Sequence, residues 1–376
     1  MGIERVTVSR RSVLRAALSG FVLAGAKTAF AGTFAVDRVR YLSACMTFGG
    51  EHRFAAFTVE GERVFETALP GRGHGCCVRP GGSEAAVFAR RPGTFLAVVD
   101  FVAGEAIRTI QSPPGRHFCE HGAFSPDGRL LYATENAFDQ GRGVIGIYDA
   151  SEGYRRLGEI PSHGVGPHEV KMLPDGETLA VANGGIRTHP ASGREKLNLD
   201  TMAPSLAYID RRSGTLLELA ELSPEWHRNS IRHLDIAEDG RVVAGLQFQG
   251  RKDHTAPLVM THRRGAAPRL LTAPANIQQD MRNYCGSICI DPSGTLAAAS
   301  APRGGLTVFW DLAAGTYAGH VSMIDGCGVA ATREDGTFVV SSGAGGAARI
   351  SAVASETLDD PYLRSRRWDN HLTAVI

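Results

Sequence analysis

The sequence lacks the features that would assign it to several common classes of protein. Lysine and arginine (40 residues) almost equal aspartate and glutamate (39), so the formal net charge is +1 and no basic field attracts nucleic acid. No run of 18 apolar residues follows residue 31, so we expect no membrane span. The chain also has no C-x-x-C pair, no Gly-x-Ser-x-Gly elbow and no His-Glu-x-x-His helix motif. These absences remove the usual signatures of zinc ribbons, α/β-hydrolases and zincin proteases.

The composition is that of a globular protein rich in turns. The 376 residues are 43% hydrophobic and 21% charged, which excludes a disordered or fibrous chain. Glycine contributes 45 residues, well above its usual share of about 7%, and it shows no collagen-like period. An excess of glycine without a period favours many turns, and many turns favour many short strands.

The first residues have the form of an export signal. The run Ser9-Arg10-Arg11-Ser12-Val13-Leu14-Arg15 matches a twin-arginine motif, and a short apolar run from Ala16 to Ala26 follows it. Ala29-Phe30-Ala31 has the small-x-small form of a cleavage site. We therefore expect residues 1–31 to be a signal peptide and residues 32–376 to form one domain, exported already folded to the periplasm.

A turn of the Pro-Asp-Gly type recurs between apolar strands. Its glycines stand at intervals of 46, 48, 64, 54 and 42 residues, at Gly82, Gly128, Gly176, Gly240, Gly294 and Gly336. Several units also contain a strand that ends in an Asp-x-x-x-Gly turn, such as Asp149 with Gly153. Four short antiparallel strands per 40–50 residues are typical of a propeller blade.

Seven such units predict an all-β protein, a seven-bladed β-propeller. The first unit is the weakest and covers roughly residues 38–70, with strands expected at Tyr41–Met46, Phe54–Val59 and Val64–Ala68. A ring of blades needs a partner for its edge strand, and we expect Phe34–Arg38 to supply the outer strand of the last blade.

Four histidines keep register with the repeat. His74, His121, His168 and His233 each stand seven or eight residues before a turn glycine, at the start of the first strand of a blade. Because the first strand of a blade is innermost, these imidazoles are expected to converge at one mouth of the central channel. Convergent imidazoles are suited to binding iron, copper or zinc, or the iron of a haem. The alternative is structural, with each histidine bonded to the backbone of the neighbouring blade.

Other candidate residues lie near these histidines or in the longest interval. Glu120, Glu169, Arg232 and His163 are their charged or basic neighbours, and Glu120, His121, His168 and Arg232 are the candidate catalytic residues of a hydrolase. The insertion that starts at Asn183 and runs to Met202 contains Arg187 and His189, candidate cofactor-binding residues, although a tolerated surface insertion explains it equally well. His371 and the preceding arginines are interpreted as a solvated end, and the seven cysteines as buried thiols, with Cys285 and Cys327 near the mouth.

Several of these segments together resemble a bacterial family, domain of unknown function 1513. They are Arg116-His117-Phe118, His121-Gly122, Thr134-Glu135-Asn136, Gly166-Pro167-His168-Glu169, residues 182–190, Lys196-Leu197-Asn198-Leu199 and Ile231-Arg232-His233. The resemblance implies a lactonase- or surface-layer-like propeller with a twin-arginine signal. It also implies gene neighbours of the imelysin and dihaem oxidoreductase types, linked to iron acquisition. Cys119-Glu120 departs from the family pattern, which has Tyr-Gly.

Three functions therefore stand as hypotheses. The first is a periplasmic accessory to iron acquisition that binds a metal, haem or a protein partner at the histidine-lined mouth, with imelysin-type or dihaem proteins as partners. The second is a lactonase-like hydrolase. The third is a scaffold that binds proteins only, and the sequence does not decide whether the protein is an enzyme.

Overall fold

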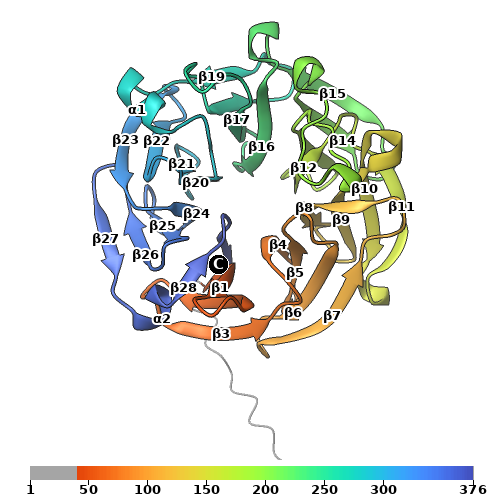
Figure 1. Cartoon of the computed structure of the whole chain (residues 1–376), viewed down its shortest axis with the longest axis horizontal. Coiled ribbons are helices and arrows are strands. Elements are labelled where there is room, and N and C mark those ends of the chain that lie inside the picture. Colours follow the sequence, from red (N-terminus) through yellow and green to blue (C-terminus); the bar gives the residue numbers. More distant parts are fainter. Residues whose placement is uncertain (1–39, 376) are drawn as a thin grey trace, which may run out of the picture. The chain divides into compact units, whose positions relative to one another are not determined.

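The computed structural model describes residues 40–375, which form a seven-bladed β-propeller (Figure 1). Six of its sheets have four antiparallel strands, and the sheet of the first blade has five. The first blade contains β1 (Arg40–Thr47), β2 (His52–Thr58), β3 (Arg63–Ala68), β28 (Arg366–Trp368) and β29 (Thr373–Val375). The second contains β4 (Gly73–Val78), β5 (Glu84–Ala89), β6 (Phe95–Asp100) and β7 (Glu105–Gln111). The third contains β8 (His117–Phe124), β9 (Leu130–Ala137), β10 (Arg142–Asp149) and β11 (Arg155–Pro161).

The other four blades repeat this plan. They contain β12 (Pro167–Met172), β13 (Thr178–Asn183), β14 (Ser205–Asp210) and β15 (Leu216–Glu221); β16 (Asn229–Ile236), β17 (Val242–Phe248), β18 (Val259–His262) and β19 (Arg269–Leu271); β20 (Ser287–Ile290), β21 (Leu296–Ala301), β22 (Leu306–Asp311) and β23 (Thr316–Ser322); and β24 (Gly326–Ala331), β25 (Phe338–Ser342), β26 (Ala347–Ile350) and β27 (Ser355–Leu358). The strands β4, β8, β12, β16, β20 and β24 face the centre of the ring (Figure 1).

Helical structure is confined to short segments between strands. The α-helices are α1 (Ala275–Asp280) and α2 (Pro361–Arg364). Single 3-10 turns are η1 (Phe138–Gln140), η2 (Ala150–Glu152), η3 (Pro190–Ser192), η4 (Leu199–Thr201) and η5 (Pro224–Trp226). No helix in residues 40–375 is long and apolar enough to cross a membrane.

The two middle strands of each blade form the core because both of their faces are covered by neighbouring blades. Alanines on these strands, such as Ala85 and Ala86, are fully buried and let the sheets approach closely. Aromatic rings fill the wider spaces: Phe118 lies 5.8 Å from Phe88 of the preceding blade and 6.1 Å from Tyr148 of its own, measured between ring centroids. The apolar core is therefore divided into seven clusters, one between each pair of neighbouring blades.

The predicted turn motifs end the strands of the blades through hydrogen bonds to backbone N–H groups. Asp311 ends β22, and its Oδ1 accepts hydrogen bonds from the backbone N–H groups of Ala313 and Ala314 at 2.8 and 2.9 Å. Gly315 then adopts φ +69°, a left-handed conformation that favours glycine. The Asp-x-x-x-Gly pattern thus specifies the tight turn between the third and fourth strands of a blade.

The ring closes differently from the expectation. Phe34–Arg38 lies outside the described residues, and the outer strand of the last blade is β27. Closure occurs in the first blade, where the C-terminal strands β28 and β29 both pair with β1 and stand on its inner side. Trp368 anchors this closure: it is buried, its ring centroid lies 5.1 Å from that of Phe57, and its Nε1 donates to the Leu363 carbonyl at 3.1 Å.

All seven cysteines are free thiols, and four of them are buried, so the interpretation of the cysteines as buried thiols holds for those four. Cys285 and Cys327 are buried, and their Sγ atoms lie 3.3 Å from the Ser287 carbonyl and 3.2 Å from the Asp369 carbonyl. Burial raises the pKa of Cys285 to about 12 and also raises that of Cys327. These two thiols are therefore packing groups in the reduced state.

A charged network surrounds Glu159 in β11, the outermost strand of the third blade. Glu159 of β11 accepts two hydrogen bonds from Arg116, at 2.8 and 2.9 Å, and one from Arg156 at 2.8 Å. The bidentate bond from Arg116 lowers the pKa of the Glu159 carboxyl from its ordinary value to about 2.

Replacement of Trp368 by alanine is expected to weaken the pairing of β28 with β1 that closes the ring. Loss of a buried tryptophan costs about 3–5 kcal/mol of unfolding free energy. The matched control is Val353→Ala, because Val353 is 90% exposed and its loss should change stability by at most about 0.5 kcal/mol. Equilibrium unfolding in urea measures both, and equal midpoints for the two variants would contradict this account of closure.

Acid should remove the stabilisation that Glu159 provides. Because its pKa is depressed in the folded state, its contribution is complete above the unfolded value of 4.5 and disappears as pH falls toward about 2. We expect Glu159→Gln to lower the unfolding free energy by about 1–2 kcal/mol at pH 7 and to have no effect near pH 2. Urea unfolding across this pH range tests it, with exposed Glu105→Gln as control; a pH-independent difference would refute it.

Candidate metal centre

Four innermost strands carry an irregularity at the same level. The pairing register shifts between Gly73 and Cys76 in β4, Phe118 and Gly122 in β8, Pro167 and Glu169 in β12, and Ile231 and His233 in β16. Such bulges release residues from the alternation of the ladder and redirect their side chains, and they are common next to functional sites. Each of these four bulges contains or adjoins one of the histidines predicted from the repeat, and the bulges of β8 and β12 also contain Glu120 and Glu169.

The structure brings the four histidines predicted from the repeat into one cluster. His121 is central, and its ring centroid lies 5.3 Å from that of His74, 4.9 Å from His168 and 5.8 Å from His233. His168 and His233 lie 4.8 Å apart. All four side chains are buried, although they come from four different blades.

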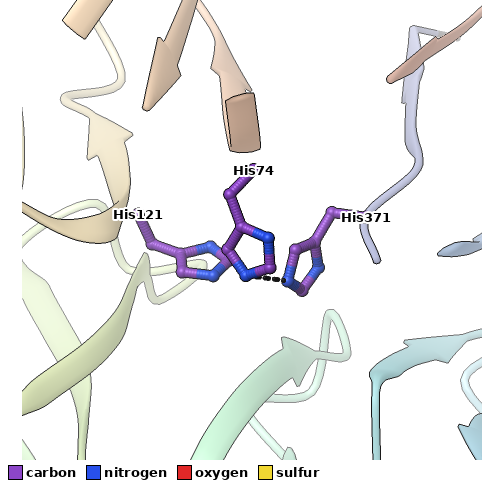
Figure 2. A group of neighbouring side chains, drawn as sticks. All are labelled: His74, His121 and His371. Carbon is purple, nitrogen blue, oxygen red and sulfur yellow. Dashed lines mark hydrogen bonds between the residues drawn. The ribbon is translucent and has the colours of Figure 1, made fainter. Parts of the chain in front are cut away.

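A fifth imidazole, His371, completes the cluster. The sequence interpretation of this residue as part of a solvated end was wrong: its ring centroid lies 4.4 Å from that of His74, 4.5 Å from His121 and 4.7 Å from His233. Figure 2 shows His74, His121 and His371 pointing toward one another, with a 3.1 Å contact between the Nε2 atoms of His74 and His371. We call these five residues the histidine cluster.

Three carboxylates hold the rings in place. Asp369 accepts a hydrogen bond from His74 Nδ1 at 2.7 Å, which fixes the tautomer with its acceptor lone pair on Nε2. Glu169 lies 3.5 Å from His233 Nδ1 and 3.8 Å from His121 Nδ1. Glu120 lies 3.6 Å from His168 Nδ1, and its own backbone has φ +84°, an uncommon conformation for a residue with a side chain.

Burial leaves the imidazoles neutral and the carboxylates charged at neutral pH. Desolvation lowers the pKa of all five histidines, that of His121 to about 3. Burial opposes ionisation of Glu169, but the adjacent His121 and His233 outweigh it and lower its pKa to about 2. Neutral imidazole nitrogens and ionised carboxylate oxygens are the forms that bind metal ions.

The cluster leaves imidazole nitrogens unsatisfied. His121 Nε2 and His233 Nε2 are buried without a hydrogen-bond partner, and His233 Nδ1 has only the Glu169 carboxylate at 3.5 Å, which is too long for a good hydrogen bond. Such atoms are rare because an unpaired buried polar group costs about 1–3 kcal/mol. A metal ion bonded to these nitrogens would remove that cost.

The donor atoms also have the spacing that a metal needs. Three overlapping groups have one ligand atom per residue within 4.8 Å of the others: His74, His121 and His371; His121, His168 and His233; and His74, Glu120 and His168. The residues present therefore fit a metal ion, and the third group combines two imidazoles with one carboxylate.

The candidate catalytic residues all belong to this region. Glu120, His121 and His168 are in or against the cluster, and Arg232 Nη1 lies 3.5 Å from His168 Nδ1. His163 is also named from the sequence as a neighbour of the histidines. Its Nε2 lies 2.9 Å from the Gly214 carbonyl. That contact gives His163 a role in turn packing.

The insertion loop borders the region without joining the histidine cluster. His189 lines a cavity, and its ring contacts Phe138 with centroids 5.2 Å apart. Arg187 does not line that cavity; its guanidinium packs over Gly141, and its backbone N–H donates to Asn198 Oδ1 at 2.7 Å. The loop thus acts as a wall, with His189 facing the cavity and Arg187 fixing the loop.

Two cavities meet at the histidine cluster. A cavity of about 430 Å³ is bordered by His121, Glu169, His233 and His371. A larger one, of about 1250 Å³, is bordered by Glu120, His168 and His233 and by the insertion loop. We call the larger one the upper cavity; through it a small molecule could reach the cluster.

Comparisons with known proteins establish the fold and the family. Hydrazine synthase of Kuenenia stuttgartiensis superimposes with a TM-score of 0.61 over 80% of this chain and 90% of that one, at 16% sequence identity, a likeness that concerns the fold alone. No curated protein matches the sequence. The model of the family described as "Protein of unknown function (DUF1513)" matches residues 67–375, so the chain belongs to that family, as its sequence resemblance predicted.

Proposed function

We propose that the histidine cluster binds a divalent transition metal, and that iron is the ion it serves. The observation that carries the proposal is the set of unsatisfied buried nitrogens on His121 and His233. Five neutral imidazoles share one space, and a cation with an affinity for imidazole supplies the partner that the protein does not.

Iron is favoured by the third donor group. His74, Glu120 and His168 provide two imidazoles and one carboxylate, the combination used by non-haem iron(II) sites. Asp369 bonded to His74 and Glu169 beside His233 would orient the rings, as outer carboxylates do at metal sites. A bound ion would supply Lewis acidity and an open coordination position toward the upper cavity.

The biological setting is part of the proposal. The twin-arginine motif supports a periplasmic protein that folds before export, and the family resemblance supports a role in iron acquisition with imelysin-type or dihaem proteins as partners. In this setting the propeller holds iron, while its partners deliver or receive it. Copper and haem, the other ligands expected from the sequence, are distinguished from iron by the same measurements.

Purified protein without a polyhistidine tag should retain a stoichiometric transition metal after loading and desalting. His74→Ala and His168→Ala should each lower the affinity at least about 10-fold, because each removes an imidazole from the group of His74, Glu120 and His168 and from one overlapping group. Mass spectrometry of metal content and competition with a chelator measure this, and a Soret band would reveal haem instead.

The matched control is His320→Ala, since His320 is an exposed histidine on β23. Its metal affinity should equal that of the unaltered protein. The proposal fails if the unaltered protein retains no iron, copper or zinc, or if loss of His74 and loss of His168 both leave the affinity unchanged.

A further inference from the structure

The upper cavity carries an excess of positive charge. Eight arginine and lysine side chains and three carboxylates line it among the described residues. Of the carboxylates, Asp253 is already paired with Arg251 at 2.5 Å, and Glu120 is buried beside the histidines. The cavity walls therefore contain more cations than the protein neutralises, which favours an anionic occupant.

Three of these cations lie against the histidine cluster. Arg90 Nη1 donates to His74 Nε2 at 2.8 Å, Arg91 Nε lies 3.7 Å from Glu120, and Arg232 adjoins His168. All three side chains also line the upper cavity. A guanidinium offers several N–H donors in a fork that matches a carboxylate, so three of them beside one cavity favour a ligand with carboxylate groups.

The neighbouring cations interact unfavourably with one another. Partial desolvation, together with the nearby Arg232 and Arg303, lowers the pKa of Lys196. Arg303 itself stacks on the Tyr284 ring with its guanidinium carbon 4.1 Å from the ring centroid. An anion between these groups would relieve their repulsion.

We propose that the upper cavity binds a small polycarboxylate, whose carboxylates are held by Arg90, Arg91 and Arg232 and one of whose oxygens reaches the metal position at His74, Glu120 and His168. A polycarboxylate fits because several guanidinium groups are available and because carboxylate oxygens are good ligands for iron. The volume of about 1250 Å³ accommodates a molecule larger than a single inorganic anion.

Metal binding and anion binding are expected to be cooperative, so that each raises the affinity for the other. Arg90 is engaged with the Nε2 of His74, and a metal on that nitrogen would replace this bond and release Arg90 to the cavity. Only this cooperative part rests on the proposed metal function. The arginines themselves are present in the metal-free protein.

Calorimetric titration tests the proposal, with citrate as the polycarboxylate probe, acetate as a probe with one carboxylate, and inorganic phosphate. It is done on metal-free protein and on protein loaded with zinc(II) as a redox-silent ion. We expect citrate to bind both forms of the protein, and to bind the zinc-loaded form more tightly than the metal-free form. In each form citrate should bind more tightly than acetate or phosphate. Raising the ionic strength should weaken it.

Variants assign the binding to the cavity. Arg232→Gln should weaken the binding of citrate at least about 10-fold. Lys196→Gln should weaken it by a smaller factor of at least about twofold, and because Lys196 is an exposed residue of the cavity wall, its loss leaves the packing intact. Arg212→Gln is the control, because Arg212 is an exposed cation outside the cavity, and it should change nothing.

The outcomes separate this inference from the metal proposal. Citrate binding that is absent, equal to phosphate binding, or unchanged in both Arg232→Gln and Lys196→Gln overturns the polycarboxylate site, even in protein that binds metal. Citrate binding to the metal-free form that depends on these residues supports the site, even in protein that fails to retain metal.

Discussion

Buried polar nitrogens need partners, and the centre of this propeller depends on that requirement. His121 and His233 each present a buried Nε2 without a hydrogen-bond partner, at a place where two cavities meet. The surrounding charges strengthen the need for a cation, because Glu169 and Glu120 are ionised while the imidazoles are neutral. A core built only for packing would avoid such a set of groups, whereas a cation-binding core requires it.

The ring of blades explains how residues so far apart in the chain can meet. Each innermost strand begins near the axis, and a bulge at the same level of four blades redirects side chains toward it. The packing between blades fixes the positions of these strands, while the loops at the rim remain outside the core. The insertion loop between β13 and β14 uses this freedom to enclose the upper cavity.

Much of this architecture could be read from the repeats. The turn glycines predict the blades, and the constant spacing from His74, His121, His168 and His233 to those glycines predicts their common level. His371 escaped this reasoning because no turn glycine follows it and no other blade contains an equivalent segment. Arg90 also escaped it, since it follows β5 and lies outside the repeated motif. Their positions depend on ring closure and on contacts between blades, which spacing along the chain does not encode.

The closure by β28 and β29 gives the last residues of the chain an influence on the whole centre. His371 lies between these two strands, so it reaches the other imidazoles only when both have docked onto β1. An ion held by His74, His121 and His371 would therefore stabilise the sealed ring at the expense of any form with a frayed tail. Removal of β29 together with His371 would then weaken the hold on such an ion while the other six blades keep all their strands, which would couple retention of the ion to the integrity of the tail.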